Sequence, residues 1–260
     1  MISNLACVHK DAKIGSNVKI DPFAYIDADV AIDDNCWIGP HATIFSGSRI
    51  GNNCKVFPGA VVGAIPQDLK FAGEYTTVEI GNNTTIREAV TVNRGTAAKG
   101  KTVIGNNVLL MACAHVGHDC VIGNNVVVAN SSLFGGEVVV DDFAIIGGAS
   151  AIHQFVHIGA HSILAGGSLV GKDIPPYVKA ARFPISYCGV NSIGLRRRNF
   201  SNETIQEIQD IYRILFMRGL NYSDAVEYIE TELAASKERD EIIMFVRNSK
   251  RGIMKGYTGQ

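Results

Sequence analysis

An aliphatic residue stands at every sixth position through most of this chain. Stepping by six from Ile2 to Val170 gives 29 positions, of which 26 are Ile, Val, Leu or Phe. The three exceptions, Asp68, Glu74 and Ala98, fall in two short stretches. Because a period of six matches neither the 3.6 residues of an α-helix nor the 3.5 of a coiled coil, this region is not helical.

A second pattern accompanies the first. The fourth residue after each aliphatic is usually small, as at Ala24 and Cys36, and the residue directly after each aliphatic is usually Gly, Asp or Asn. Gly and Asn tolerate the positive φ of sharp corners. The two patterns together predict short β segments, each turning one large and one small side chain inward, stacked about 4.8 Å apart.

These repeats resemble those of the hexapeptide-repeat acyltransferase superfamily. The resemblance implies a mainly β fold, a left-handed parallel β-helix with three hexads per coil, so that residue n lies over residue n+18. The left hand comes from the resemblance alone, since the general rule for parallel crossovers gives the other hand. Cys36, Cys54 and Cys120 occupy the small inward position, and we expect them to pack in the core.

The repeat divides the chain into regions. Residues 1–176 are predicted to form the β-helix, with loop excursions at 64–79 and 95–103, and consecutive prolines at 175 and 176 are expected to end its ladders. A connector is predicted over 177–200. Residues 201–260 are predicted to be a small all-α C-terminal domain, with one helix capped by Ser201, a second opening at Ser223-Asp224 and a third over about 238–248.

Composition excludes several classes of protein. The net charge is −1, which argues against a nucleic-acid binder, although it divides into −4 over residues 1–178 and +3 over 179–260. The chain has no run of about 18 apolar residues, so no membrane span is predicted. The first residues lack the features of a secretory signal, and the six cysteines form no disulfide framework or zinc ribbon. We therefore expect a cytoplasmic protein.

The stretch 112–120, Ala-Cys-Ala-His-Val-Gly-His-Asp-Cys, carries the strongest chemical signal. Stacking by 18 residues places His118 under Gly136 and Gly136 under Gln154, the neighbour of His153. A histidine beside a carboxylate, here Asp119, is typical of a general base, and a bare glycine N–H can stabilise an oxyanion. His115 stacks under Leu133. Because no serine or cysteine nucleophile is placed there, direct transfer is favoured over a covalent acyl-enzyme.

Other interpretations of the same histidines stay open at this point. They could be surface residues without a catalytic role, on the outside of a non-catalytic scaffold. They could also bind zinc, as three histidines do in the related γ-type carbonic anhydrases, although His115-x-x-His118 is short spacing for that purpose. We predict no metal.

A closer resemblance rests on longer motifs. The chain is similar to the acyl-[acyl-carrier-protein]–UDP-N-acetylglucosamine O-acyltransferase family nearly from end to end, helical tail included. The motifs that carry the likeness are Gln67-Asp68-Leu69-Lys70-Phe71-Ala72-Gly73-Glu74, Ala114–Cys120, Asp141–Gly148, His153-Gln154-Phe155 and Pro175-Pro176-Tyr177.

The resemblance implies transfer of a 3-hydroxyacyl chain from acyl carrier protein to the 3-hydroxyl of UDP-N-acetylglucosamine, at the start of lipid A biosynthesis. It implies a homotrimer with active sites between subunits and no cofactor beyond the phosphopantetheine arm of the carrier. The implied catalytic residues are His118 as base, Asp119 as its partner and Gly136 as oxyanion donor. The implied substrate contacts are Asp68, Lys70, His115, His153, Gln154, Gly166, Asn191, Arg197 and Arg198.

Two positions depart from the family pattern. Many relatives have a histidine in place of Glu137 and an acidic residue in place of Ile193. Gly166 stands where the family ends its acyl-chain ruler, and a glycine there predicts a long chain. The alternatives are a 3-amino sugar acceptor, a coenzyme A donor, and the later N-acyltransferase of the pathway, which carries a uridine-binding domain before its β-helix.

Overall fold

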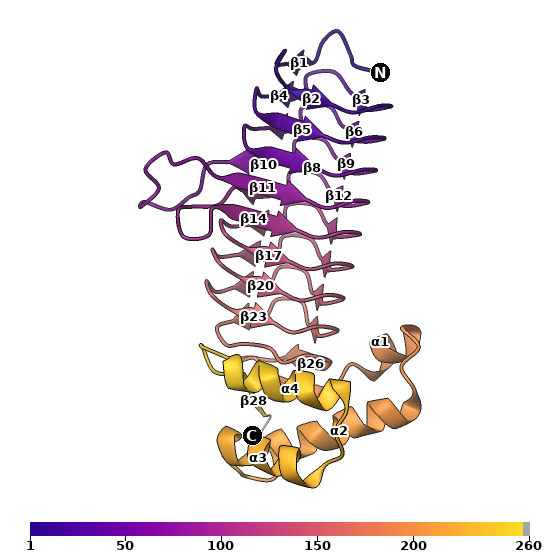
Figure 1. Cartoon of the computed structure of the whole chain (residues 1–260), viewed down its shortest axis with the longest axis vertical. Coiled ribbons are helices and arrows are strands. Elements are labelled where there is room, and N and C mark those ends of the chain that lie inside the picture. Colours follow the sequence, from indigo (N-terminus) through magenta and orange to yellow (C-terminus); the bar gives the residue numbers. More distant parts are fainter. Residues whose placement is uncertain (257–260) are drawn as a thin grey trace.

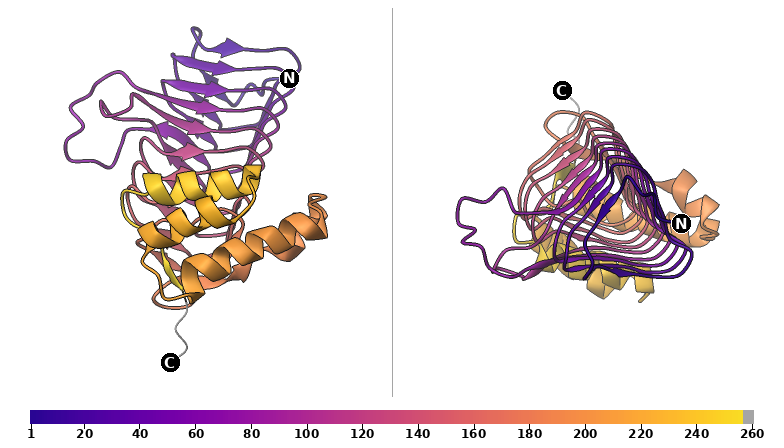
Figure 2. Two further views of the ribbon diagram at one scale, coloured as in Figure 1. Left: turned by 60° about the horizontal axis from the view of Figure 1, so that its bottom comes forward. Right: turned by 90° about the horizontal axis from the view of Figure 1, so that it is seen from above.

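The computed structural model describes residues 1–256, so the last four residues of the predicted helical domain lie outside it. The chain winds into a tall parallel β-helix of triangular cross-section, closed at one end by helices (Figures 1 and 2). This confirms the predicted β-helix followed by α-helices.

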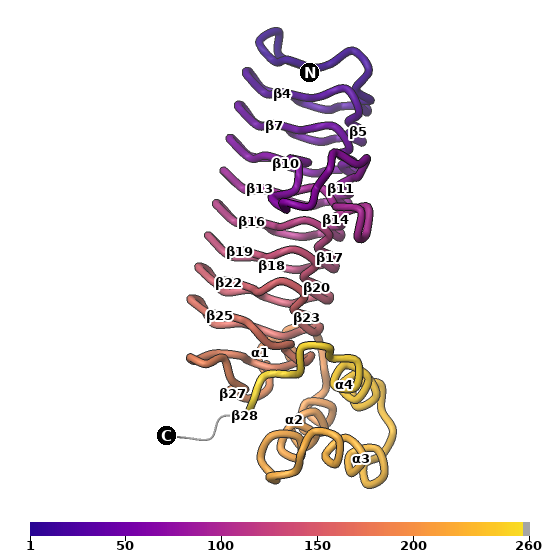
Figure 3. Tube along the Cα trace, turned by 90° about the vertical axis from the view of Figure 1, so that its left-hand side faces the viewer, coloured from indigo at the N-terminus to yellow at the C-terminus, as the bar shows by residue number. Residues whose placement is uncertain are grey.

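Three sheets form the faces of the triangle, and each coil contributes one strand to each sheet. Sheet 1, which faces the viewer in Figure 3, consists of β1 (Cys7–Val8), β4 (Tyr25–Ile26), β7 (Thr43–Ile44), β10 (Val61–Ala64), β13 (Thr91–Asn93), β16 (His115–Val116), β19 (Leu133–Phe134), β22 (Ala151–Ile152) and β25 (Leu169–Val170). Sheet 2 consists of β2 (Lys13–Ile14), β5 (Val30–Ile32), β8 (Ser48–Ile50), β11 (Thr77–Ile80), β14 (Lys101–Ile104), β17 (Val121–Ile122), β20 (Val139–Val140) and β23 (His157–Ile158). Sheet 3 consists of β3 (Lys19–Ile20), β6 (Trp37–Ile38), β9 (Lys55–Val56), β12 (Thr85–Ile86), β15 (Leu109–Leu110), β18 (Val127–Val128), β21 (Ile145–Ile146), β24 (Ile163–Leu164), β26 (Val178–Ala181), β27 (Ser186–Val190) and β28 (Lys255–Gly256).

The strand register confirms the predicted stacking. His115 pairs with Leu133 and Leu133 with Ala151, each 18 residues further on. The two loops interrupt this spacing by whole hexads, since Val62 pairs with Val92 and Val92 with Val116. The sixfold phase therefore survives both loops because each inserts a multiple of six residues into its coil.

The aliphatic series fills the interior of the helix, with its small partners at the other inward position. Ile26, Ile86 and Val128 are fully buried, and Cys36, Cys54 and Cys120 are buried beside them, as the sequence predicts. Burial of each large aliphatic side chain contributes roughly 1.5–3 kcal/mol.

The corners confirm that Asn and Gly take the positive φ. It falls on the third residue after the aliphatic, as at Asn107, Asn125 and Gly59, whereas Gly105, directly after its aliphatic, does not have it. Gly105 is needed for space, because a Cβ there would lie 2.7 Å from backbone atoms of Gly123 in the next coil. The asparagine that follows each of these glycines forms a ladder from coil to coil: the backbone N–H of Asn106 donates to Asn124 Oδ1 at 2.9 Å.

The β-helix continues past the predicted end at the two prolines. They occupy a corner, where no ladder hydrogen bond is required of them, and β26 then pairs in parallel with β24. The predicted connector 177–200 thus holds β26, β27 and the short helix α1 (Ser192–Arg197).

Three longer helices complete the described chain: α2 (Asn202–Met217), α3 (Tyr222–Glu232) and α4 (Lys237–Asn248). Ser201 caps α2 through its side chain, as predicted, whereas the cap of α3 is Asn221 and not Ser223. The helices are tied to the last coil, since the Tyr212 hydroxyl donates to Pro176 O at 2.6 Å. In residues 1–256 every helix is too short or too polar to cross a membrane.

Candidate active site

The site is built at the edge where sheet 1 turns into sheet 2, between β16 and β17. His118 and Asp119 form this corner, and Asp119 takes the left-handed conformation with φ 59°. His118 Nδ1 lies 2.8 Å from Asp119 Oδ2. Because a carboxylate can only accept, Nδ1 carries the proton and Nε2 keeps its lone pair. The arrangement leaves Nε2 as the free base of the pair.

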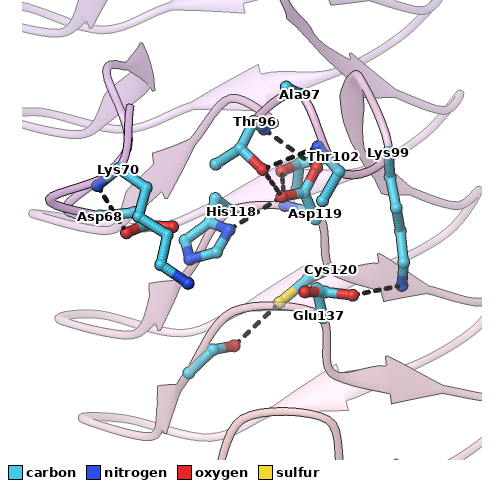
Figure 4. A network of polar contacts seen from close by, with 12 residues as sticks. Asp68, Lys70, Thr96, Ala97, Lys99, Thr102, His118, Asp119, Cys120 and Glu137 are labelled. Carbon is cyan, nitrogen blue, oxygen red and sulfur yellow. Dashed lines mark hydrogen bonds and ion pairs between the residues drawn. The ribbon is translucent and has the colours of Figure 1, made fainter. Parts of the chain in front are cut away.

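Asp119 is fully buried, and His118 is 13% exposed at its side chain. A buried carboxylate requires hydrogen-bond donors, and these come from the second loop. The Thr96 N–H donates to Oδ1 at 3.0 Å and the Thr96 hydroxyl to Oδ2 at 2.6 Å. The Asp119 N–H donates in turn to the Thr102 hydroxyl at 2.8 Å. In Figure 4 both threonines are drawn above Asp119, and the His118 ring is drawn below it and to its left.

Gly136 lies one coil beyond His118, as the stacking predicts. A Cβ on Gly136 would overlap the imidazole of His118, so the ring is packed directly against the glycine. Among residues 1–256 the Gly136 N–H makes no hydrogen bond, while the neighbouring Glu137 N–H donates to His118 O at 2.8 Å. The bare corner thus presents a backbone donor beside the base.

His115 projects outward from sheet 1 in the same coil. Its Nδ1 lies 2.7 Å from the Thr91 hydroxyl. Burial lowers the pKa of His115, so its neutral form is favoured at neutral pH. His115 is therefore suited to hydrogen bonding rather than to holding a charge.

His153 and Gln154 occupy the same edge one coil beyond Gly136. The Phe155 N–H donates to Gly136 O at 3.2 Å, which fixes this corner over that of Gly136. His153 is exposed, and its Nδ1 lies 3.0 Å from Gln154 O. Two coil spacings, roughly 10 Å, separate the His118 corner from this one.

The first loop, residues 65–76, leaves the coil at the same edge. Asp68 Oδ1 accepts from the Lys70 N–H at 2.9 Å, and both residues lie beside His118 in Figure 4. Glu74 joins the two loops, since its carboxylate accepts from Ala72 N at 2.8 Å and from Ala97 N at 3.0 Å. Its own backbone N–H, and then these two backbone donors, lower the pKa of Glu74.

Glu137, one of the two departures from the family pattern, has a partner in the second loop. Lys99 Nζ lies 3.8 Å from Glu137 Oε2. The acidic residue is therefore accompanied by a cation at the rim of the site (Figure 4). The other departure, Ile193, is 67% exposed on α1.

The remaining sequence-predicted residues lie on the other two edges. Gly166 is exposed at the corner between β24 and β25, where sheet 3 turns into sheet 1. Asn191 lies near the corner of sheets 2 and 3, where its Nδ2 donates to His161 O at 2.9 Å and its Oδ1 caps α1. Arg198 packs on Phe143 at that edge, and Arg197 is exposed. Within one chain, these residues therefore lie on different edges of the β-helix from His118.

Four residues of the site escaped sequence reasoning: Thr91, Thr96, Lys99 and Thr102. Stacking by 18 fails across the loops, because the number of residues that leave the coil is not known beforehand. Once the inserted hexads are known, Thr91 stacks under His115 at a separation of 24. The loop threonine Thr96 carries no periodic signal at all.

Three or more His, Cys, Asp or Glu side chains come together nowhere in the described part of the chain in a way that could hold a metal ion. The pair of His118 and Asp119 is completed by two threonines: the Thr96 hydroxyl donates to the Asp119 carboxylate, and the Thr102 hydroxyl accepts from the Asp119 N–H.

Comparison with known proteins agrees with this geometry. Residues 173–254 match the family model described as UDP N-acetylglucosamine O-acyltransferase, domain 2, and residues 11–46 and 101–136 match bacterial transferase hexapeptide repeats. The acyl-[acyl-carrier-protein]–UDP-N-acetylglucosamine O-acyltransferase of Trichlorobacter lovleyi is 53% identical over 255 residues, covering 96% of this chain and 98% of that one.

Solved structures give the same result. The UDP-N-acetylglucosamine acyltransferase of Bacteroides fragilis superposes with a TM-score of 0.97 at 56% identity, covering 98% of this chain and 100% of that one. The Francisella novicida enzyme superposes with a TM-score of 0.96 at 36% identity, covering 99% and 95%. The match gives the coil the expected left hand. The chain belongs to the acyl-[acyl-carrier-protein]–UDP-N-acetylglucosamine O-acyltransferase family.

Proposed function

We propose that this protein transfers a 3-hydroxyacyl chain from acyl carrier protein to the 3-hydroxyl of UDP-N-acetylglucosamine, the first step of lipid A biosynthesis. The observation that carries the proposal is the His118–Asp119 pair, whose 2.8 Å contact leaves Nε2 free beside the bare Gly136. This geometry fits general-base attack by a hydroxyl on a thioester, and the related enzymes are named for that reaction.

The proposed reaction is a direct transfer. His118 Nε2 removes the proton of the sugar hydroxyl as its oxygen attacks the thioester carbonyl. The oxyanion that forms is stabilised by the Gly136 N–H, and buried Asp119 stabilises the imidazolium. Collapse breaks the carbon–sulfur bond, and the imidazolium returns its proton to the departing phosphopantetheine thiolate. The products are the 3-O-acylated sugar nucleotide and the free thiol of the carrier, so the enzyme requires no cofactor of its own.

The substrate contacts divide between the two ends of the reaction. Asp68, Lys70 and His115 contact the sugar-diphosphate side near the base. His153 and Gln154, along the same edge, border the acyl channel. The net charge of +3 over residues 179–260 suits an acidic carrier protein docking at the helical end, in the cytoplasm.

The uridine and phosphate contacts, Asn191, Arg197 and Arg198, require a second subunit. They lie near the edge between sheets 2 and 3, whereas His118 lies at the edge between sheets 1 and 2. A substrate that touches both sets must bridge two molecules. We therefore propose a homotrimer with active sites between subunits.

The function is tested by His118→Ala, with His9→Ala, a histidine at an ordinary corner of the N-terminal coils, as the matched control. Loss of the general base should lower kcat by about 10²–10⁴-fold, while the control keeps the wild-type rate. Light scattering on both variants should show the same oligomer. Donors of graded chain length should be offered with both the 3-hydroxyl and the 3-amino acceptor. Retained transfer by His118→Ala would overturn the assignment.

A further inference from the structure

The carboxylate of Asp119 is fixed by a residue from outside the coil. Thr96 belongs to the segment between β13 and β14, and it is 6% exposed. Its N–H and its hydroxyl reach different oxygens of the same carboxylate, at 3.0 and 2.6 Å. Both oxygens are therefore held, and the plane of the carboxylate cannot turn without breaking one of these bonds.

The two bonds determine where Asp119 Oδ2 lies. That oxygen accepts from the Thr96 hydroxyl and from His118 Nδ1 at once. Without the threonine hydroxyl, Oδ2 of this fully buried carboxylate loses its shortest hydrogen bond, and only the Thr96 N–H on Oδ1 remains to resist rotation of the carboxylate away from the ring. The imidazole would then lose the bond that fixes its tautomer and its orientation.

We propose that Thr96 is a positioning residue that acts on His118 through Asp119, so that the base is set by a triad of His118, Asp119 and Thr96. The proposal rests on the proposed function for its kinetic consequences. Its structural part, that Thr96 maintains the His118–Asp119 hydrogen bond, holds whatever the substrate.

The loop that contains Thr96 is itself joined to the first loop by hydrogen bonds. Glu74 accepts from Ala97 N, the residue next to Thr96, and from Ala72 N within its own loop. The loop that carries Asp68 and Lys70 is therefore tied to the loop that holds the base. The Ala98 N–H also donates to the Thr96 hydroxyl oxygen at 3.2 Å, which orients the hydroxyl proton toward Asp119.

The kinetic test compares Thr96→Val, Thr96→Ser and Asp119→Asn with the double variant Thr96→Val/Asp119→Asn. Thr96→Val should lower kcat by about 10–100-fold with KM for the sugar nucleotide within about threefold, because the loss is in the placement of the base. Thr96→Ser retains the hydroxyl and should restore the rate. In the Asp119→Asn background, Thr96→Val should change kcat by less than about threefold, since residues acting as a unit are not additive.

Thr84→Val is the matched control. Thr84, like Thr96, is buried with a bonded hydroxyl, which donates to Gly105 O at 2.9 Å, but it lies ahead of β12 and away from the site. It should keep the wild-type kcat.

A proton NMR spectrum tests the structural part without any substrate. The His118 Nδ1 proton should give a downfield resonance that disappears in His118→Ala, is lost in Thr96→Val and returns in Thr96→Ser. If wild-type protein transfers no acyl group, the proposed function fails while this readout still decides the role of Thr96. An unchanged resonance in Thr96→Val, or a full multiplicative loss of kcat in the Asp119→Asn background, would overturn the proposal.

Discussion

At the scale of single residues, the site depends on a side chain that is missing. Gly136 does not have the positive φ that demands glycine, so its backbone would accept any residue. The constraint is instead the imidazole of His118, which fills the space where a Cβ would stand. A small residue at this corner is therefore a requirement of the site and not of the coil.

Gly136→Ala should leave the fold intact and damage the chemistry. The added methyl displaces His118 from Asp119, and a misplacement on the order of 1 Å costs about 10²-fold in kcat. Gly171→Ala, with open space around its Cβ position, is the control and should be without effect. Steady-state kinetics and thermal unfolding of both variants check the prediction, which an active Gly136→Ala enzyme would contradict.

We propose that Gly166 governs a different property, the length of the acyl chain. It is exposed at its corner, and a Cβ there would lie 3.1 Å from Gly148 O, so a longer side chain must project outward. We expect the enzyme to prefer chains on the order of 14 carbons or more, and Gly166→Met to shift the preference to shorter ones by about 10–200-fold per excluded methylene. Competition between donors of different length measures this. Fastest turnover of short donors by the wild type, together with no shift in Gly166→Met, would refute it.

At the scale of elements, the hexads predicted the coils and which residues stack along the edge between sheets 1 and 2. A strict period with one large inward residue sets the register, so the stacking of His118, Gly136 and Gln154 followed from counting. What counting could not reach were contacts made by segments without a period. Thr96 holds Asp119 from a loop, and the two prolines, which were expected to end the ladders, occupy a corner that is followed by the next strand, β26.

His161 illustrates a contact of this second kind, where the coil meets the C-terminal region. Its ring stacks on Phe143 at 4.9 Å and on Tyr177 at 5.5 Å. Burial, and then the cation of Arg198, lowers its pKa to about 4. The unfolded chain binds a proton on this residue near its ordinary value of 6.5, so the folded state is progressively destabilised as pH falls from about 6.5 to about 4.

His161→Phe should remove this part of the acid sensitivity. Phenylalanine already occupies the same left-handed corner position at Phe23, Phe143 and Phe155. Between pH 7 and pH 4.5 the melting temperature of the variant should fall by about 2–4 °C less than that of the wild type. This corresponds to about 1 kcal/mol, discounted because the ring is partly exposed. Equal pH slopes in thermal melts of the two proteins would show that His161 does not titrate as argued.

At the scale of the whole molecule, the triangular coil distributes the proposed site over three edges. His118 lies between sheets 1 and 2, Gly166 between sheets 3 and 1, and Arg197 follows Asn191 near the edge of sheets 2 and 3. The faces of a rigid β-helix keep these edges apart, so no bending within one chain can bring the sets together. Packing of neighbouring chains side by side can do so.

Mixed oligomers of two variants test the proposed homotrimer directly. His118→Ala removes the base and Arg197→Glu replaces an exposed cation by a carboxylate that repels a diphosphate, so each pure variant should be nearly inactive. If one site takes His118 from one subunit and Arg197 from its neighbour, about one of the three sites in each hybrid trimer has both residues intact, which is about one quarter of all sites after random co-assembly of equal amounts. Co-expression with two affinity tags, tandem purification and a measurement of kcat per trimer should therefore recover activity that mixing the pre-formed trimers does not. Hybrids as inactive as their parents would mean that both residues serve the same subunit.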